Sequence, residues 1–271
     1  MRNQLLLTMF ILILAVYLST PATAGINDGL IVYYSFDETD GKTASDVSKN
    51  GNDAELTGTA AWATDEGKIG GTLRLDGSAS SAVDTDGADY INGLEEFSVS
   101  VWVKSDTAPH DRGIFIAKDP AGGDDTFTLR YDSAGRKVPA AVRLIKAGFT
   151  TTGGGIQYES ADNIQTTEWQ HLALTWSSGD PVMLYIDGVL DEPQYNNDVR
   201  TGSISNATKF IVGQGGKDNG GTSWTGLIDE LRIYDRVIDA NEIAELTSGV
   251  LPVEPTDKLA TTWANLKQNR D

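Results

Sequence analysis

Residues 97–103 read Phe97-Ser98-Val99-Ser100-Val101-Trp102-Val103, with apolar side chains at the odd positions and two serines and a tryptophan at the even ones. Successive side chains of a strand point to opposite faces, so this alternation predicts a β-strand with one face in a core. Residues 169–176 (Trp-Gln-His-Leu-Ala-Leu-Thr-Trp) have a similar pattern. Residues 182–186 form a third predicted strand, which ends at Asp187-Gly188, a dipeptide that strongly favours a hairpin turn.

The rest of the chain consists largely of short apolar runs separated by turns rich in glycine, of which there are 29. One helix is predicted after Asp239, because Asp239 and Glu242 have the spacing of a capping box and Ile243 and Leu246 would point inward. Many short strands with hardly any helix predict an all-β fold, a two-sheet antiparallel jelly-roll sandwich with one short C-terminal helix. The remaining predicted strands are residues 30–36, 72–75, 113–118, 127–131, 140–145, 209–212 and 226–234.

The N-terminus has the features of a signal peptide. Arg2 precedes an apolar run over residues 5–18, and Ala22-Thr23-Ala24 matches the small-residue pattern that signal peptidases cut. The run is shorter than the roughly 20 apolar residues that a membrane span needs. We therefore expect residues 1–24 to be removed and the protein to be exported, to the extracellular space, the cell surface or the periplasm; an uncleaved anchor is the alternative.

Residues 25–249 are expected to form one domain, and residues 250–271 a linker and a short amphipathic tail. The linker begins with the proline-containing stretch 251–255, whose composition favours an extended chain. Residues 257–268 then place Leu259, Trp263 and Leu266 on one helical stripe. Such a helix could dock to a partner, although a frayed tail is the alternative because short isolated helices are marginal in water.

Composition excludes several classes of function. The chain has no cysteine, so thiol chemistry is excluded and the fold must be held by its core, with or without a metal. Its 39 acidic residues against 21 basic ones give a formal charge of −18. A surface this negative disfavours nucleic acid and anionic membranes, and it suits divalent cations, although solubility alone explains most of the acids.

Seven blocks of sequence follow one another along the chain: Tyr34-Ser35-Phe36-Asp37-Glu38 and residues 46–54, 67–77, 97–104, 169–175, 185–188 and 226–236. In this order they resemble the laminin-G-like jelly-roll family of the concanavalin A-like lectin and glucanase superfamily. The resemblance implies the predicted sandwich fold, and it does not fix the function, since members include carbohydrate-binding modules, adhesion domains and domains appended to hydrolases.

A calcium site is predicted at the turn from Asp46 to Asp53, which places two carboxylates and two asparagines around one glycine. Calcium prefers six to eight oxygen ligands, which turns supply from side chains and carbonyls. The alternatives are an ordinary Asn-Gly turn with side-chain-to-backbone bonds, or a calcium site in the loops 84–89 or 119–125. The resemblance implies that acids of two further strands join the turn, so the predicted ligands are Asp37, Asp46, Asn50, Asn52 and Asp229.

No catalytic residue is predicted. The glucanases of the superfamily carry Glu-x-Asp-x-x-Glu on one strand, and this pattern is absent from the sequence. The nearest acids, Asp229 and Glu230, are adjacent, so their side chains would point to opposite faces of a strand. Of the two histidines, His110 lies in a polar loop, and His171 is interpreted as a strand residue with a satisfied hydrogen bond rather than a base.

Saccharide binding is predicted at aromatic residues in polar, glycine-rich company, because rings stack on sugars while amides bond hydroxyls. Local packing is the alternative for each ring, and Trp102, Trp169 and Trp176 are assigned to the core. The predicted ligand-binding residues are Tyr158, Tyr195, Asn196 and Trp224.

The function that fits these features best is a secreted, non-catalytic binding module, stabilised by calcium, that recognises carbohydrate or a cell-surface partner. It would act through loops at one rim or along a concave sheet face. A structural or adhesive surface protein and a glycoside hydrolase are the alternatives. Nucleic acid, and membrane insertion after signal cleavage, are not expected.

Overall fold

The computed structural model describes residues 25–249, except for residues 79, 86, 109–110, 119–126, 136, 139, 197–198 and 215–222. Several sequence predictions therefore lie outside the described residues, namely the signal peptide (1–24), the linker and tail (250–271), His110, Asp86 and the loop 119–125.

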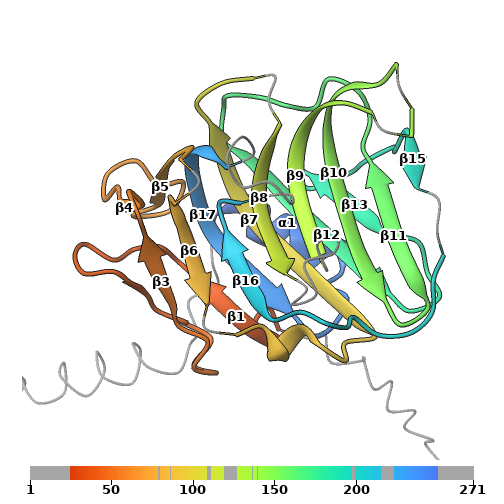
Figure 1. Cartoon of the computed structure of the whole chain (residues 1–271), viewed down its shortest axis with the longest axis horizontal. Helices are drawn as coiled ribbons and strands as arrows, with labels where there is room; N and C mark the ends of the chain where they lie inside the picture. Colours follow the sequence, from red (N-terminus) through yellow and green to blue (C-terminus); the bar gives the residue numbers. More distant parts are fainter. Residues whose placement is uncertain are drawn as a thin grey trace, which may run out of the picture.

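Two antiparallel sheets form the domain, which confirms the predicted all-β sandwich (Figure 1). Sheet A consists of β1 (Leu30–Tyr34), β4 (Ala61–Trp62), β5 (Leu73–Asp76), β7 (Glu96–Ser105), β12 (Gln170–Ser177), β13 (Met183–Ile186), β14 (Val189–Leu190) and β17 (Thr225–Tyr234). Its strand order is β14-β13-β12-β7-β17-β5-β4, with β1 also paired to β17.

Sheet B consists of β2 (Thr43–Ala44), β3 (Ala54–Thr57), β6 (Ala82–Thr85), β8 (Arg112–Lys118), β9 (Phe127–Ala134), β10 (Val142–Thr151), β11 (Gly154–Glu159), β15 (Tyr195–Asn196) and β16 (Lys209–Val212). Its order is β15-β11-β10-β9-β8-β16-β6-β3-β2. A short 3₁₀ turn, η1 (Asp89–Ile91), connects β6 to β7.

The core lies between the two sheets, and the alternation in β7 determines which side chains enter it. All the odd positions from Phe97 to Val103 are at most 1% exposed. Phe97 is the centre of an aromatic cluster: its ring centre lies 4.9 Å from that of Phe127, 5.1 Å from Phe149 and 5.8 Å from Trp176. Because Phe127 and Phe149 belong to sheet B, this cluster joins the two sheets.

Helix α1 (Ala240–Ser248) covers the outer face of sheet A, as the sequence predicts. Asp239 forms the capping box with Glu242, and Gly249 ends the helix with a φ of 68°, a left-handed conformation that glycine adopts without strain. Ile243 and Leu246 are buried in a second apolar cluster with residues of β12 and β17. No helix of the described chain is both long and apolar enough to span a bilayer.

Candidate functional site

The outer face of sheet B has a hollow of about 410 Å³ over β9, β10 and β11. Its floor lies at Gly148, which pairs with Thr128 on one neighbouring strand and Gln157 on the other. Directly opposed residues of antiparallel strands share a face, so a threonine and a glutamine flank a position that has no side chain. The methyl group of Thr128 faces this position, while its Oγ1 is buried and has no hydrogen-bond partner in the described part of the chain. The hollow therefore has one methyl group and one amide beside a bare backbone floor.

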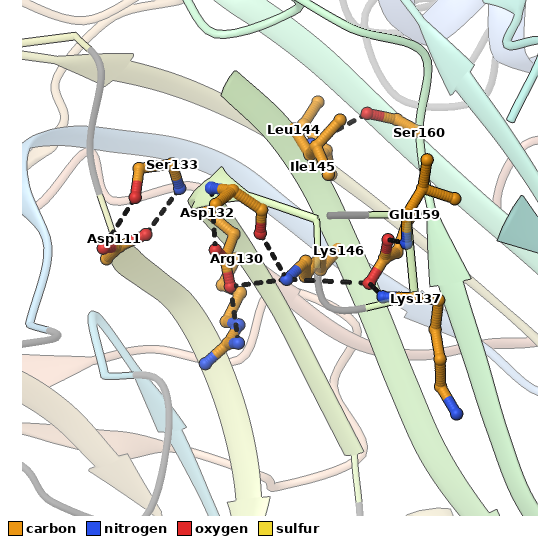
Figure 2. Close-up of polar contacts among 12 residues, drawn as sticks. Asp111, Arg130, Asp132, Ser133, Lys137, Leu144, Ile145, Lys146, Glu159 and Ser160 are labelled. Carbon is orange, nitrogen blue, oxygen red and sulfur yellow. Dashed lines mark hydrogen bonds and ion pairs between the residues drawn. The ribbon is translucent and has the colours of Figure 1, made fainter. Parts of the chain in front are cut away.

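One row of side chains crosses the sheet beside this floor. Arg130 is opposite Lys146, Lys146 is opposite Glu159, and Glu159 is opposite Tyr195. The four residues come from β9, β10, β11 and β15, and the pairing places them all on the outer face. Figure 2 shows Arg130 and Glu159 on either side of Lys146.

Lys146 is the centre of an ionic network. Its Nζ donates to the carbonyl of Ala134 at 2.7 Å and lies 3.1 Å from Oδ2 of Asp132 and 3.6 Å from Oε1 of Glu159. Arg130 Nη2 shares the same Asp132 oxygen at 2.6 Å. Lys146 is 8% exposed and Glu159 3%. Charges this far from water are costly unless they are paired, and each of these has its partner.

Glu159 also orders the turn that links β9 to β10. Its Oε1 accepts the backbone N–H of Lys137 at 2.9 Å, and its Oε2 accepts that of Val138 at 3.3 Å. This turn forms part of the lining of the hollow, and the Nζ of Lys137 lies 5.5 Å from the ring centre of Tyr195. One buried carboxylate thus holds both the lysine of the network and the backbone of an adjacent wall.

Of the predicted ligand-binding residues, Tyr195 lies in the row of side chains beside the hollow, and Tyr158 belongs to the lining itself. Asn196 is opposite Tyr158, a core residue, so it faces the other side of the sheet, where its Nδ2 donates to the carbonyl of Val182 at 2.8 Å. The prediction that places Asn196 together with Tyr195 is therefore wrong, because strand parity puts the two residues on opposite faces, and Asn196 is only partly buried on its own side.

The predictions for Tyr158 and Trp224 are also wrong, since both rings belong to the core. Tyr158 is 2% exposed, and its hydroxyl donates to Asp191 at 2.6 Å. Trp224 is completely buried and packs against Tyr131 with 5.1 Å between ring centres. A ring enclosed on both faces cannot stack on a sugar, so local packing explains these two aromatics.

The predicted calcium ligands separate into two groups. Asp46 is one centre: its Oδ1 accepts the backbone N–H groups of Tyr33 and Ser48, and its Oδ2 accepts that of Asn52. The side chains of Asn50 and Asn52 donate to backbone carbonyls of β1. Because both carboxylate oxygens accept N–H groups, this turn has the side-chain-to-backbone arrangement of the alternative interpretation and does not fit a calcium ion.

Asp37 and Asp229 are instead joined through the loop 67–71. Asp37 Oδ1 accepts the N–H of Gly71 at 2.7 Å, and Asp229 Oδ2 accepts those of Lys68 and Ile69 at 2.8 and 3.0 Å. The five predicted ligands therefore do not form one site, and no cluster of three or more His, Cys, Asp or Glu side chains suited to a metal occurs in the described ranges.

Asp229 nevertheless has an unusual environment. It is completely buried, and its Oδ1 has no hydrogen-bond partner among the described residues. Burial, together with the nearby charges of Glu230 and Asp37, raises the pKa of its carboxyl to about 8. A buried carboxylate oxygen without a donor fits a cation, which would offset the cost of the charge.

Strand alternation predicts that Asp229 and Glu230 point to opposite faces, and the structure contradicts this prediction. A β-bulge in the pairing of β17 with β7 follows Asp229, and Glu230 has a φ of 55°. Ile228 and Leu231 both enter the core, so the two acids between them share the outer side of sheet A. Both are at most 1% exposed, and Glu230 is bonded by Arg232 and Tyr33. They are closed off from any polysaccharide.

His171 is a buried strand residue, as interpreted from the sequence. Its Nε2 lies 2.8 Å from the Ser100 hydroxyl, and its Nδ1 lies 2.9 Å from that of Thr247 on α1. Burial, together with the charges of Arg232 and Lys68, lowers its pKa to about 3. The imidazole is therefore neutral and inaccessible, and its two hydrogen bonds link helix α1 to sheet A.

The residues of the hollow were not identified from the sequence. Arg130, Lys146 and Glu159 each stand beside buried apolar residues within a strand, for example in Ile145-Lys146-Ala147. A charge in such a run indicates an outward position on a sheet, and this signal was available. Which of these charges meet depends on cross-strand pairing, which the pattern does not reveal.

Comparison with solved structures gives a consistent picture. Domain 4 of AbnA, a GH43 extracellular arabinanase from Geobacillus stearothermophilus, was solved in complex with arabinotriose. It is 27% identical with a TM-score of 0.57, covering 80% of this chain and 98% of that domain. The binding domain of Paraclostridial Mosquitocidal Protein 1 shares the fold at 17% identity, with a TM-score of 0.58 over 82% of this chain and 52% of its own.

Two sequence comparisons add to this. The human Adhesion G-protein coupled receptor D1 is 24% identical over 54% of this chain, which spans only 21% of the receptor. The family model of the concanavalin A-like lectin/glucanases superfamily matches residues 76–244. That match extends from β5 into α1 and covers more than half of the sequence, so the chain belongs to the concanavalin A-like lectin/glucanases superfamily.

Proposed function

We propose that this protein is a secreted, non-catalytic carbohydrate-binding module that holds an oligosaccharide in the hollow on the outer face of sheet B. The carrying observation is the bare floor at Gly148, between the methyl group of Thr128 and the amide of Gln157. Sugars need donors and acceptors for their hydroxyls and a flat surface for their rings, and these residues supply both. The arabinotriose complex of a domain with this fold supports the same class of ligand.

The outer face of sheet A is less suitable. Helix α1 covers it, and its polar side chains, such as His171, Glu230 and Arg232, are buried and bonded to one another or to the helix. The buried carboxylates Asp229 and Glu230 are also the reason that the proposed module is non-catalytic, since a glycoside hydrolase needs two carboxyl groups that reach the substrate.

A glycan array with the exported chain tests the proposal, and Gly148→Gln is the deciding variant. A Cβ at Gly148 would meet only ordinary contacts, at 3.4 Å from the Ile156 carbonyl and 3.7 Å from Thr128, so the new side chain fills the hollow without strain. Gly87→Gln is the matched control, because a Cβ there meets nothing within 4 Å and Gly87 lies away from this hollow.

We expect Gly148→Gln to lose saccharide binding while Gly87→Gln retains it. Equal binding by Gly148→Gln and the unaltered protein would overturn the assignment of the hollow. If the unaltered protein bound no saccharide, the adhesive or structural alternative would replace the proposal.

Calcium is the second part of the proposal, at Asp37 and Asp229 rather than at the turn 46–53. The unpartnered Oδ1 of buried Asp229 supports it, and the negative charge of the chain favours cation uptake. A bound ion would stabilise the closing strand β17 against the loop 67–71, with no part in ligand chemistry.

A further inference from the structure

Basic side chains gather at the hollow although the chain as a whole is acidic. The lining contains Arg130, Lys137 and Lys146 but only one carboxylate, that of Glu159. Asp132 bonds both Arg130 and Lys146, and the carboxylate of Asp111 interacts with the charge of Arg130, so three acidic groups balance the three basic ones. The whole chain carries −18, so this group is far less negative than the molecule around it.

The charge of Lys146 is already used within the protein. Its ammonium group has two carboxylates and one carbonyl as partners and is almost completely buried. It therefore fixes the network and has little capacity left for a ligand.

Arg130 and Lys137 retain N–H donors that a ligand could use. The Arg130 side chain is 31% exposed, and only its Nη2 bonds Asp132. A guanidinium has five N–H donors in a planar fork, which leaves a pair suited to a second carboxylate. The Lys137 ammonium group lies near the Tyr195 ring and is paired with no carboxylate in the described part of the chain. Figure 2 shows these two basic side chains on either side of Lys146.

We infer that the hollow binds a carboxylated oligosaccharide, with the uronic acid carboxylates of two separate sugar units at Arg130 and at Lys137 and a sugar ring over Gly148. This inference rests on the proposed function and names its ligand class. The carboxylates accept from the remaining N–H groups of Arg130 and from the Lys137 ammonium group, while the amide of Gln157 bonds hydroxyl groups. A simple inorganic anion would contact the basic groups, but it would leave the floor at Gly148 and the amide of Gln157 without a partner.

The test compares two forms of one sugar, trigalacturonate and its fully methyl-esterified form, by isothermal titration calorimetry on the exported chain. The two forms have the same hydroxyl groups, and they differ in the charge of their carboxyl groups. Charge-assisted hydrogen bonds are stronger than neutral ones, so the acid should bind about tenfold more tightly at low salt. The preference should shrink at high salt, because partly exposed charges are screened.

Arg130→Gln and Lys137→Gln should each reduce the preference for the acid. Arg74→Gln is the matched control: this arginine is 41% exposed and pairs with Asp106 on sheet A, so its loss should leave the preference intact. Melting curves of the three variants establish that each is folded.

Equal affinity for the acid and its ester would overturn the inference, as would an unchanged preference in Arg130→Gln and Lys137→Gln. If a neutral saccharide such as arabinotriose binds at least as tightly as trigalacturonate and Gly148→Gln abolishes that binding, the proposed function stands while the inference fails. If no saccharide of either kind binds, both fail.

Discussion

Lys146 and Glu159 lie directly opposite each other on β10 and β11, with 3.6 Å between Nζ and Oε1, on the outer face of a sheet whose other face is the core. A pair of well-packed apolar residues would stabilise such a position as well as a buried ion pair does. The pair instead orders the turn at Lys137 and Val138, which forms a wall of the hollow. We therefore expect the Lys146–Glu159 pair to contribute both to the free energy of unfolding and to ligand binding.

Lys146→Met should destabilise the domain by about 3 kcal/mol, because it removes a buried ammonium group that pairs with the buried carboxylates of Asp132 and Glu159. Lys209→Met is the control: Lys209 pairs with Asp84 at 2.8 Å, but its side chain is 48% exposed, so its loss should cost at most about 1 kcal/mol. Urea denaturation of both variants measures the difference. Similar losses would show that the Lys146 network is no stronger than a surface ion pair.

Acid should destabilise the protein through His171. Its folded pKa of about 3 lies below the unfolded value of 6.5, so the unfolded chain binds a proton that the folded chain does not. Stability is full above about pH 6.5 and falls by up to about 1.4 kcal/mol per pH unit as the pH decreases toward 3. His171→Gln should weaken this dependence between pH 6.5 and 4, measured by urea denaturation at each pH. An unchanged slope would contradict the buried, neutral imidazole.

Calcium chelation should lower the melting temperature if a metal binds only the folded state. The proposed ligands make the response specific: Asp229→Asn should melt at the same temperature with and without chelator. Asp46→Asn should still melt at a lower temperature with chelator than without it, because Asp46 is bonded to the backbone N–H groups of Tyr33 and Asn52 and is not a proposed ligand. A melting curve of the unaltered protein that chelator leaves unchanged would exclude a tightly bound structural calcium.

Asp239→Ala should destabilise the domain by about 1 kcal/mol, since it removes the acceptor of two N–H groups at the start of α1. Asn241→Ala, at an exposed position of the same turn, should change stability little. Thermal melts of the two variants decide the question. If Asp239→Ala melted at the same temperature as Asn241→Ala, the capping box would contribute nothing to the docking of the helix.

The sequence alone determined the fold, because the physical signal of a sandwich is local. Alternation in β7 and β12 indicates which side chains face the core between the sheets, Asp187-Gly188 indicates where a hairpin turns, and Asp239 with Glu242 indicates where the helix begins. Each of these depends on a few neighbouring residues. Strand β11 was missed because it opens with two glycines, which predicted a turn.

Only the tertiary structure decided the site. Arg130, Lys146, Glu159 and Tyr195 meet because four strands pair in one register, and a shift by a single residue would turn each of them to the other face. The same parity sends Tyr158 into the core, although its polar neighbours resemble those of a binding residue. The sequence gives the type of each side chain, whereas its cross-strand neighbours in the sheet are fixed by the packing of the whole sandwich.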